Sequence, residues 1–142
     1  MTQKVKILDI DRLVVAIAIS RNTINTLIEN KAFPAPIQIL GKAKRWDVKE
    51  IESWMRAKIL ERNHSPKEYY DYHRPENENK LLRFHSYATL KAEFGVARSS
   101  LYVLMRDGGF PHPVKLSARR VGWVESEVID WFEAQKLKRQ ML

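Results

Sequence analysis

The sequence contains no cysteine, which excludes disulfide bonds and thiolate metal sites. It also lacks a long hydrophobic run. The longest one, from Leu13 to Ile19, is about a third of the roughly 20 residues that a membrane-spanning helix needs. No signal-peptide core or cleavage pattern follows the N-terminal lysines. We therefore expect a protein of the cytoplasm that is associated with the nucleoid when bound to DNA, with no membrane partner.

Motifs of catalysis are missing as well. The four histidines have no metal-ligand spacing, and the sequence shows no Gly-rich phosphate loop, serine elbow or paired-carboxylate motif. We expect neither an enzyme nor a protein that holds a cofactor or a metal ion.

Positive charge, by contrast, is in excess. The chain has 25 Lys and Arg against 17 Asp and Glu, which gives a formal net charge of +8. Such a balance attracts polyanions, whether nucleic acid, an anionic membrane or an acidic protein. The position of the charges relative to the fold decides among these partners.

An internal repeat is the most informative feature of the sequence. A shift of 77 residues aligns residues 7–60 with 84–137 without a gap. Trp46 and Trp54 then match Trp123 and Trp131, and Phe-Pro-x-Pro at 33–36 matches 110–113. Tryptophan is rare, so these paired matches indicate a duplicated domain of about 60 residues. We expect a first domain at 1–62, a linker at 63–80 and a second domain at 81–142.

Charge follows the same division. Residues 1–62 carry 12 basic and 7 acidic groups, and residues 81–142 carry 10 and 6. The predicted linker carries 3 and 4. Each copy is therefore basic by itself. The linker also contains a Tyr-rich cluster at 69–73, which could belong to a loose connection, to a segment packed on one domain or to a protein-binding patch.

Each copy has the same coarse organisation. The apolar spacing predicts a first helix near 10–18 and 87–94, a tight break, and a second helix from Ser20 or Arg21 and from Arg98. Phe-Pro-x-Pro ends the second helix, and two alternating strands and a third helix follow. We expect a mainly α fold with small β-hairpins, arranged as two tandem winged helix-turn-helix domains.

The apolar residues of the hairpins are expected to point inward. In the first hairpin these are Ile37 and Ile39, with Gln38 outward. In the second they are Val114 and Leu116. The four tryptophans lie beside apolar neighbours, which favours a core position over base stacking.

These residues resemble a known family. The pattern Ser-Arg-x-Thr-Ile, Phe-Pro-x-Pro, Trp, Glu-Ile and Trp, from Ser20 to Trp54, is similar to that of the AlpA-type prophage regulators and of related excisionase-like, MerR-like winged helix-turn-helix proteins. The stretch from Arg98 to Trp131 is similar too. At the turn the family usually has Gly, which Gly95 supplies and Ala18 does not. The resemblance implies control of integration, excision or phage genes.

The second helix of a helix-turn-helix enters the major groove with its early residues on base edges. Arg can pair with guanine and Asn with adenine, and Lys or Arg on a hairpin suits phosphate or the minor groove. The alternative interpretation is a solvated polar surface. The predicted DNA-binding residues are Arg21, Asn22, Thr23, Asn25, Arg98, Ser99, Ser100, Tyr102 and Arg106 on the second helices, and Lys42, Lys44, Arg45, Lys115, Arg119 and Arg120 on the wings.

The sequence thus predicts a reader of double-stranded DNA that binds two adjacent, unlike half-sites through heads joined by a flexible tether. A transcriptional regulator of a phage or mobile element fits this hypothesis. So does an excisionase-like directionality factor that works with an integrase or another phage protein. A winged-helix adaptor that binds only protein is the alternative from another class. The oligomeric state stays open.

Overall fold

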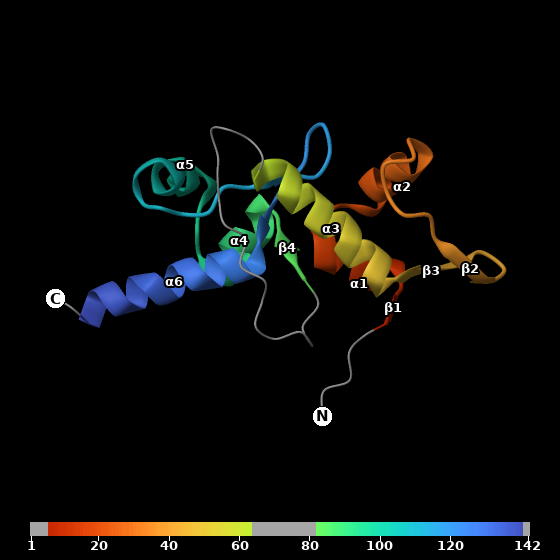
Figure 1. The fold of residues 1–142 in the computed structure, drawn as a ribbon, viewed down its shortest axis with the longest axis horizontal. Coiled ribbons are helices and arrows are strands. Elements are labelled where there is room, and N and C mark those ends of the chain that lie inside the picture. Colours follow the sequence, from red (N-terminus) through yellow and green to blue (C-terminus); the bar gives the residue numbers. More distant parts are fainter. Residues whose placement is uncertain (1–5, 64–81, 141–142) are drawn as a thin grey trace, which may run out of the picture.

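The computed structural model describes residues 6–63 and 82–140, so most of the predicted linker lies outside the described residues. We call 6–63 the first unit and 82–140 the second unit (Figure 1). The first unit contains β1 (Ile7–Leu8), α1 (Ile10–Ile17), α2 (Arg21–Glu29), β2 (Ile37–Leu40), β3 (Ala43–Asp47) and α3 (Val48–Asn63). The second unit contains β4 (Phe84–His85), α4 (Tyr87–Phe94), α5 (Arg98–Asp107), β5 (Val114–Lys115), β6 (Val121–Val124) and α6 (Glu125–Gln140).

Both units have the same small antiparallel sheet. The strand order is β1-β3-β2 in the first unit and β4-β6-β5 in the second. The expected mainly α fold with small β-hairpins is confirmed, as is the order helix, helix, hairpin, helix. The edge strands β1 and β4 were not predicted, because two residues are too short for a periodic signal.

The tight break between the first two helices uses the left-handed conformation in both units. Ala18 has φ 57° and Gly95 has φ 70°. The backbone makes the same turn although only one unit has glycine, which adopts this conformation without steric cost. The start of the second helix differs: Ser20 accepts a hydrogen bond from the backbone N–H of Thr23 at 3.3 Å, whereas Ala97 makes no side-chain cap.

The tryptophans hold the loop between the second helix and the hairpin. The Nε1–H of Trp46 donates to the carbonyl of Pro34 at 3.1 Å, and that of Trp123 donates to Pro111 at the same distance. Both rings are buried, as expected. Trp54 and Trp131, both partly buried, donate to the carbonyls of Ala32 and Gly108 at 2.8 and 2.9 Å and lie edge-on to the Phe of Phe-Pro-x-Pro. An indole satisfies a loop carbonyl while its ring fills the core.

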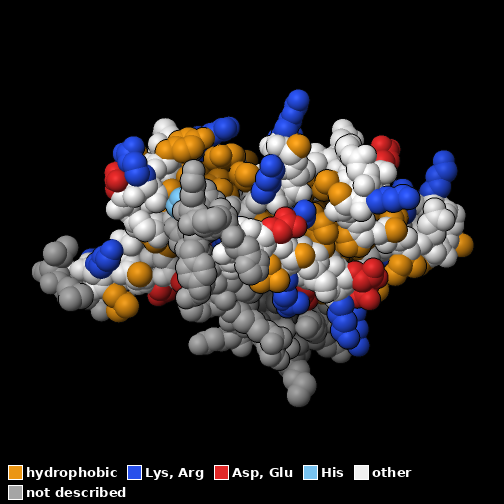
Figure 2. Space-filling model, turned by 45° about the horizontal axis from the view of Figure 1, so that its top comes forward, with side chains coloured by type: hydrophobic (Ala, Val, Ile, Leu, Met, Phe, Trp, Pro, Cys, Tyr) orange, Lys and Arg blue, Asp and Glu red, His pale blue; other side chains and the backbone are white. Residues whose placement is uncertain are grey.

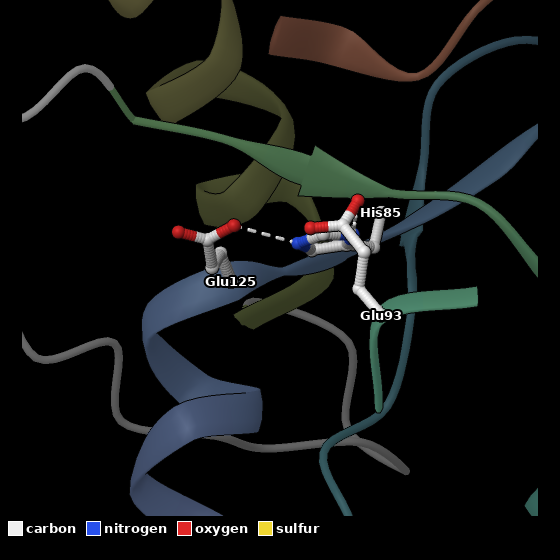
Figure 3. A group of neighbouring side chains, drawn as sticks. All are labelled: His85, Glu93 and Glu125. Carbon is white, nitrogen blue, oxygen red and sulfur yellow. Dashed lines mark hydrogen bonds and ion pairs between the residues drawn. The ribbon is translucent and has the colours of Figure 1, made fainter. Parts of the chain in front are cut away.

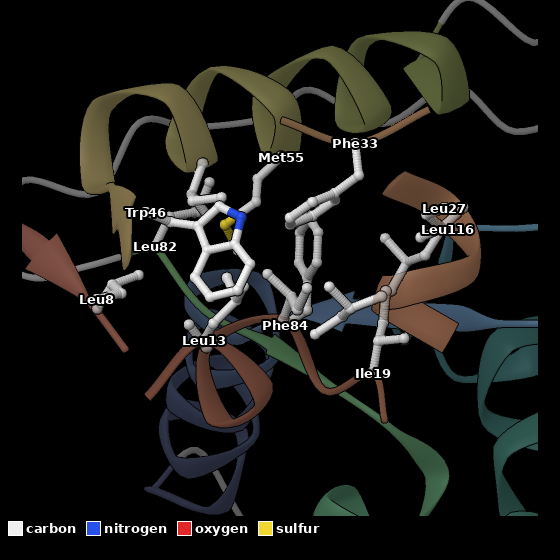
Figure 4. Packing of buried hydrophobic residues seen from close by; sticks show 14 of the residues in the cluster. Leu8, Leu13, Ile19, Leu27, Phe33, Trp46, Met55, Leu82, Phe84 and Leu116 are labelled. Carbon is white, nitrogen blue, oxygen red and sulfur yellow. The ribbon is translucent and has the colours of Figure 1, made fainter. Parts of the chain in front are cut away.

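The two units share one hydrophobic core. Phe84 and Leu116 of the second unit lie among Ile19, Phe33 and Met55 of the first (Figure 4). Leu82, Val114 and Val124 belong to the same cluster, and a smaller cluster around Leu90, Leu101, Phe110 and Trp123 fills the rest of the second unit.

Polar contacts reinforce this shared core. The guanidinium of Arg62, at the end of α3, donates to both carboxylate oxygens of Glu127 at 2.7 Å and to the carbonyl of His112 at 3.0 Å. The side chains of Arg62 and Glu127 are only 2% and 11% exposed. Arg83 also donates to the carbonyl of Val15 at 3.4 Å. Packing therefore sets the spacing of the units, and the expectation that tether length sets it is corrected.

One predicted orientation is wrong in the first hairpin. Ile37 and Ile39 were expected to point inward but are 44% and 58% exposed. Their equivalents Val114 and Leu116 are buried, as predicted, because α3 of the first unit packs against β5. Within residues 6–63 and 82–140, no helix packs against β2 as α3 does against β5, so a similar strand pattern gives burial in only one copy.

Replacing Arg62 tests whether the shared core is real. Arg62→Ala leaves the largely buried Glu127 carboxylate, 11% exposed, without its bidentate partner, so we expect the free energy of unfolding to fall by about 3 kcal/mol. Chemical denaturation followed by circular dichroism measures this. The matched control is Arg139→Ala, at the equivalent, exposed position of α6, which should change stability by less than about 0.5 kcal/mol. Equal effects of the two variants would contradict the packing of the units.

Candidate nucleic-acid interface

The second helices of both units lie on the same side of the molecule. In Figure 1, α2 and α5 occupy opposite ends of the upper side, and the connection between β5 and β6 rises between them. Figure 2 shows Lys and Arg side chains distributed across this side, with acidic and hydrophobic side chains between them. Helices α2 and α5 therefore lie at opposite ends of one side of the molecule.

In the first unit, α2 and the β2–β3 hairpin enclose an open groove of about 560 Å³. Five of the predicted DNA-binding residues meet there. The groove is lined by Asp9, Ile10, Arg21, Asn25, Gln38, Lys42, Ala43, Lys44, Arg45 and Trp46. Helix and wing therefore contribute to a single concave, basic surface, the shape that a duplex edge or backbone requires.

The groove does not include every predicted residue of α2, and it includes one residue that was not predicted. Asn22 is exposed but does not line the groove, and the Thr23 hydroxyl lies 3.0 Å from that of Ser20, so it belongs to the helix cap. Gln38 lines the groove and was not predicted as a contact. Its amide can donate and accept toward a base edge. Strand alternation, which placed Gln38 outward, was the signal that could have identified it.

Arg21 is held by a weak ion pair. Its guanidinium lies 3.1 Å from the Asp11 carboxylate on α1, and the two side chains are 62% and 84% exposed. Pairs this exposed contribute little because water and salt screen them. Asp11 therefore orients Arg21 only weakly, and the guanidinium can exchange this ion pair for a hydrogen bond to a ligand.

Arg98 is oriented by aromatic residues instead. Its guanidinium lies 4.1 Å from the ring centroid of Tyr87, a cation–π arrangement. Hydrogen bonding to Tyr87 and then to Arg98 lowers the pKa of Tyr102, while burial and the hydrogen bond to Tyr102 raise the pKa of Tyr87. Tyr87, Arg98 and Tyr102 thus form a connected polar and aromatic cluster across α4 and α5.

The remaining predicted contacts of the second unit are all exposed. Arg106 pairs with its neighbour Asp107 at 3.1 Å, and both are largely open to solvent. The others are Ser99 and Ser100 on α5 and Lys115, Arg119 and Arg120 on the wing. Their exposure fits contact with a ligand, and Arg119 and Arg120 lie in the connection between β5 and β6, which rises between α2 and α5.

A second group of titratable residues lies at the junction of β4, α4 and α6. Nε2 of the buried His85 lies 2.7 Å from the carboxylate of Glu125, and Glu93 approaches from α4 (Figure 3). His85 Nδ1 is 3.0 Å from the hydroxyl of Thr89, and Arg83 pairs with Glu93 at 2.6 Å and with Glu125 at 3.3 Å.

This group has the donor atoms of a cation site, but a guanidinium already neutralises it. The hydrogen bond to Arg83 lowers the pKa of Glu93, and the same bond raises the pKa of Arg83. The equivalent residues of the first unit are Leu8, Ala16 and Val48, all buried. The polar group therefore replaces an apolar contact at the same place in the fold, which gives it a structural role in joining strand and helices.

Comparisons with known proteins agree with this geometry. The family model described as prophage CP4-57 regulatory protein (AlpA) matches twice, over residues 6–59 and 81–137. An uncharacterized protein, ORF88, of Enterobacteria phage P4 is 46% identical over 37 residues, which cover 26% of this chain and 42% of that protein. The matched stretch is thus less than half of that relative. No solved structure matches.

Among the described residues no helix is long and apolar enough to span a membrane. The two family matches cover most of the chain and coincide with the two helix-turn-helix units, each with its wing. The repeat found in the sequence is therefore a repeat of one family's domain. The chain belongs to the AlpA family of prophage regulatory proteins, whose domain it contains twice in tandem.

Proposed function

We propose that the chain is a sequence-specific double-stranded DNA-binding protein that regulates transcription in a phage or mobile element. The observation that carries the proposal is the basic groove between α2 and the β2–β3 hairpin. It places Arg21 and Asn25, which suit base edges, opposite Lys42, Lys44 and Arg45, which suit phosphates. The family's description as regulatory favours a regulator over a directionality factor.

The two units read different bases in this proposal. The domains at 1–62 and 81–142 present unlike residues at equivalent positions of the recognition helix: Asn25 corresponds to Tyr102, and Asn22 to Ser99. Arg21 and Arg98 are common to both. The binding site then consists of two unlike half-sites in direct orientation, and the shared core holds the heads at a fixed distance.

Replacing the shared arginines tests the recognition helices. We expect Arg21→Ala and Arg98→Ala each to weaken specific binding by about tenfold to a hundredfold, because each loses a contact worth about 1–3 kcal/mol. Random-sequence selection supplies the duplex, and a mobility shift measures the affinity. Lys138→Ala, an exposed cation on α6, is the control and should leave the affinity unchanged.

Unchanged affinity in both arginine variants would reject the assignment of these helices. Absence of any DNA binding, with salt-insensitive binding to a protein, would assign the chain to the adaptor class instead. If the chain binds and bends DNA and stimulates excision but does not repress or activate a reporter, it is a directionality factor.

The dependence of DNA affinity on salt concentration tests the wing residues. If both units together neutralise about eight phosphates, log affinity should fall with log salt with a slope of about −7. Lys44→Ala should reduce the magnitude of that slope by about 1 while weakening binding to all sequences about equally. Titrations at several salt concentrations, on a selected and a scrambled duplex, measure both effects. A slope near zero would contradict phosphate contact.

A further inference from the structure

The contact between the two units joins two different surfaces, a helix of the first unit and the sheet of the second. Helix α3 of the first unit lies on the sheet of the second unit, where Phe84, Val114 and Leu116 are at most 1% exposed. Arg62 completes the contact through its bidentate ion pair with Glu127. The third helix of one repeat thus binds the sheet of the next, a heterologous arrangement in which two different surfaces meet.

The first unit keeps a free copy of the sheet surface. Ile7, Ile37 and Ile39 are the equivalents of Phe84, Val114 and Leu116, yet they are 46%, 44% and 58% exposed. Register places Ile7 opposite Asp47 and Ile37 opposite Arg45 on neighbouring strands. Residues opposite each other share a face, so Ile7 and Ile37 flank Asp47 and Arg45 on one face of the sheet, and the exposed Ile39 follows at a register shift between Gln38 and Leu40. We call the surface formed by Ile7, Ile37, Ile39, Arg45 and Asp47 the open sheet face.

The second unit keeps a free copy of the helix surface. Helix α6 is 16 residues long, as α3 is, and the shift of 77 residues aligns the two helices from end to end. On α3, the side of Glu52, Met55, Ile59 and Arg62 is buried. The equivalents on α6 are Ile129, 38% exposed, Phe132, which is partly buried against Phe94 and Trp131, and the exposed Lys136 and Arg139. We call this side the open helix face.

The two open faces are complementary in charge. Arg139 and Glu50, both exposed, are the equivalents of Arg62 and Glu127, so the bidentate pair of the shared core can form again between them. A second pair is also complementary. Where the shared core has the apolar Ile59 and Val124, the open helix face has Lys136 and the open sheet face has Asp47, a cation and an acid. Lys136 contacts only the exposed Glu133 among the ion pairs that the described residues show.

We propose that the open helix face of one copy of this chain binds the open sheet face of a second copy, so that molecules associate head to tail. The second copy repeats the arrangement that already joins the two units. Because the contact is heterologous and each molecule keeps one free face of each kind, association continues beyond a dimer. The interface does not depend on the proposed DNA binding.

One difference makes this contact weaker than the internal one. Gly122 lies at the centre of the buried sheet surface, where a Cβ atom would be 2.8 Å from Leu116 and 3.1 Å from Phe84. Its equivalent is Arg45, which is partly exposed, lies opposite Ile37 in the register and also lines the groove beside α2. A side chain at this position takes up space that Gly122 leaves open. A second copy cannot approach as closely as α3 does, so association is reversible and depends on concentration.

Sedimentation velocity without DNA, over a wide range of protein concentrations, tests this proposal. The average sedimentation coefficient of the wild type should rise steadily with concentration and not level at a dimer. Arg139→Glu should weaken association by at least tenfold, which is about 1.4 kcal/mol, because it faces Glu50 with a like charge. The double variant Arg139→Glu/Glu50→Arg should restore it. Lys138→Glu, with the same charge change on another side of α6, should associate as the wild type does.

Circular dichroism and thermal unfolding of every variant confirm that it is folded. A concentration-independent monomer, a closed dimer or failure of the charge-swapped pair to associate would each overturn the proposal. Ile39→Asp should also abolish association. If it instead weakens DNA binding and leaves sedimentation unchanged, the open sheet face serves DNA and the proposal is wrong. Because sedimentation is measured without DNA, its failure leaves the proposed regulatory function intact.

Discussion

The packing of α3 against the sheet of the second unit is the contact on which the rest of the structure depends. It buries Phe84, Val114 and Leu116 together with Met55 and Ile59 in one continuous core. A domain of about 60 residues buries a smaller share of its surface than a larger domain does and is marginally stable alone. Sharing a core gives both repeats the apolar burial that one repeat cannot supply. It also fixes where α2 and α5 lie relative to each other.

This fixed arrangement changes how a tandem DNA reader works. A tethered pair of heads gains affinity through effective concentration and accepts a range of half-site spacings. A pair joined by a core avoids the cost of ordering the heads on DNA but accepts only the spacing that the core dictates. The duplication therefore does more than supply a second copy of a contact surface. It joins two small domains through one core, and in the proposed function these domains are two unlike reading heads.

Much of the fold could be predicted from the sequence because its signals are local. Ser20 starts a helix and Phe-Pro-x-Pro ends one, and the tryptophan spacing identified the repeat. The shared core could not be predicted, because Val114 and Ile37 stand in the same local pattern and only a partner helix decides which of them is buried. The His85 group was missed for a similar reason. Glu125 is 40 residues from His85 in the chain and reaches it only because β4 pairs with β6.

The candidate site, too, could be predicted only as far as local sequence signals reach. Helical spacing placed Arg21 and Asn25 outward, and hairpin position placed Lys42 and Lys44 on the wing. Spacing alone could not show that these residues line one groove with Gln38, since that depends on the angle between α2 and the hairpin. Nor could it show that Asp11 and Tyr87 orient the two shared arginines, because these partners lie on the preceding helices.

Hydroxyl-radical footprinting on a selected duplex tests the central claim most directly. The chain is compared with a variant in which Gly-Ser residues are inserted into the segment between the units, at 64–81. If the shared core sets the spacing of the heads, both proteins protect two patches at the same separation and with similar affinity. If the separation varies in the lengthened variant, or if one patch is lost, the heads are independent and the account of a rigid two-headed reader is contradicted.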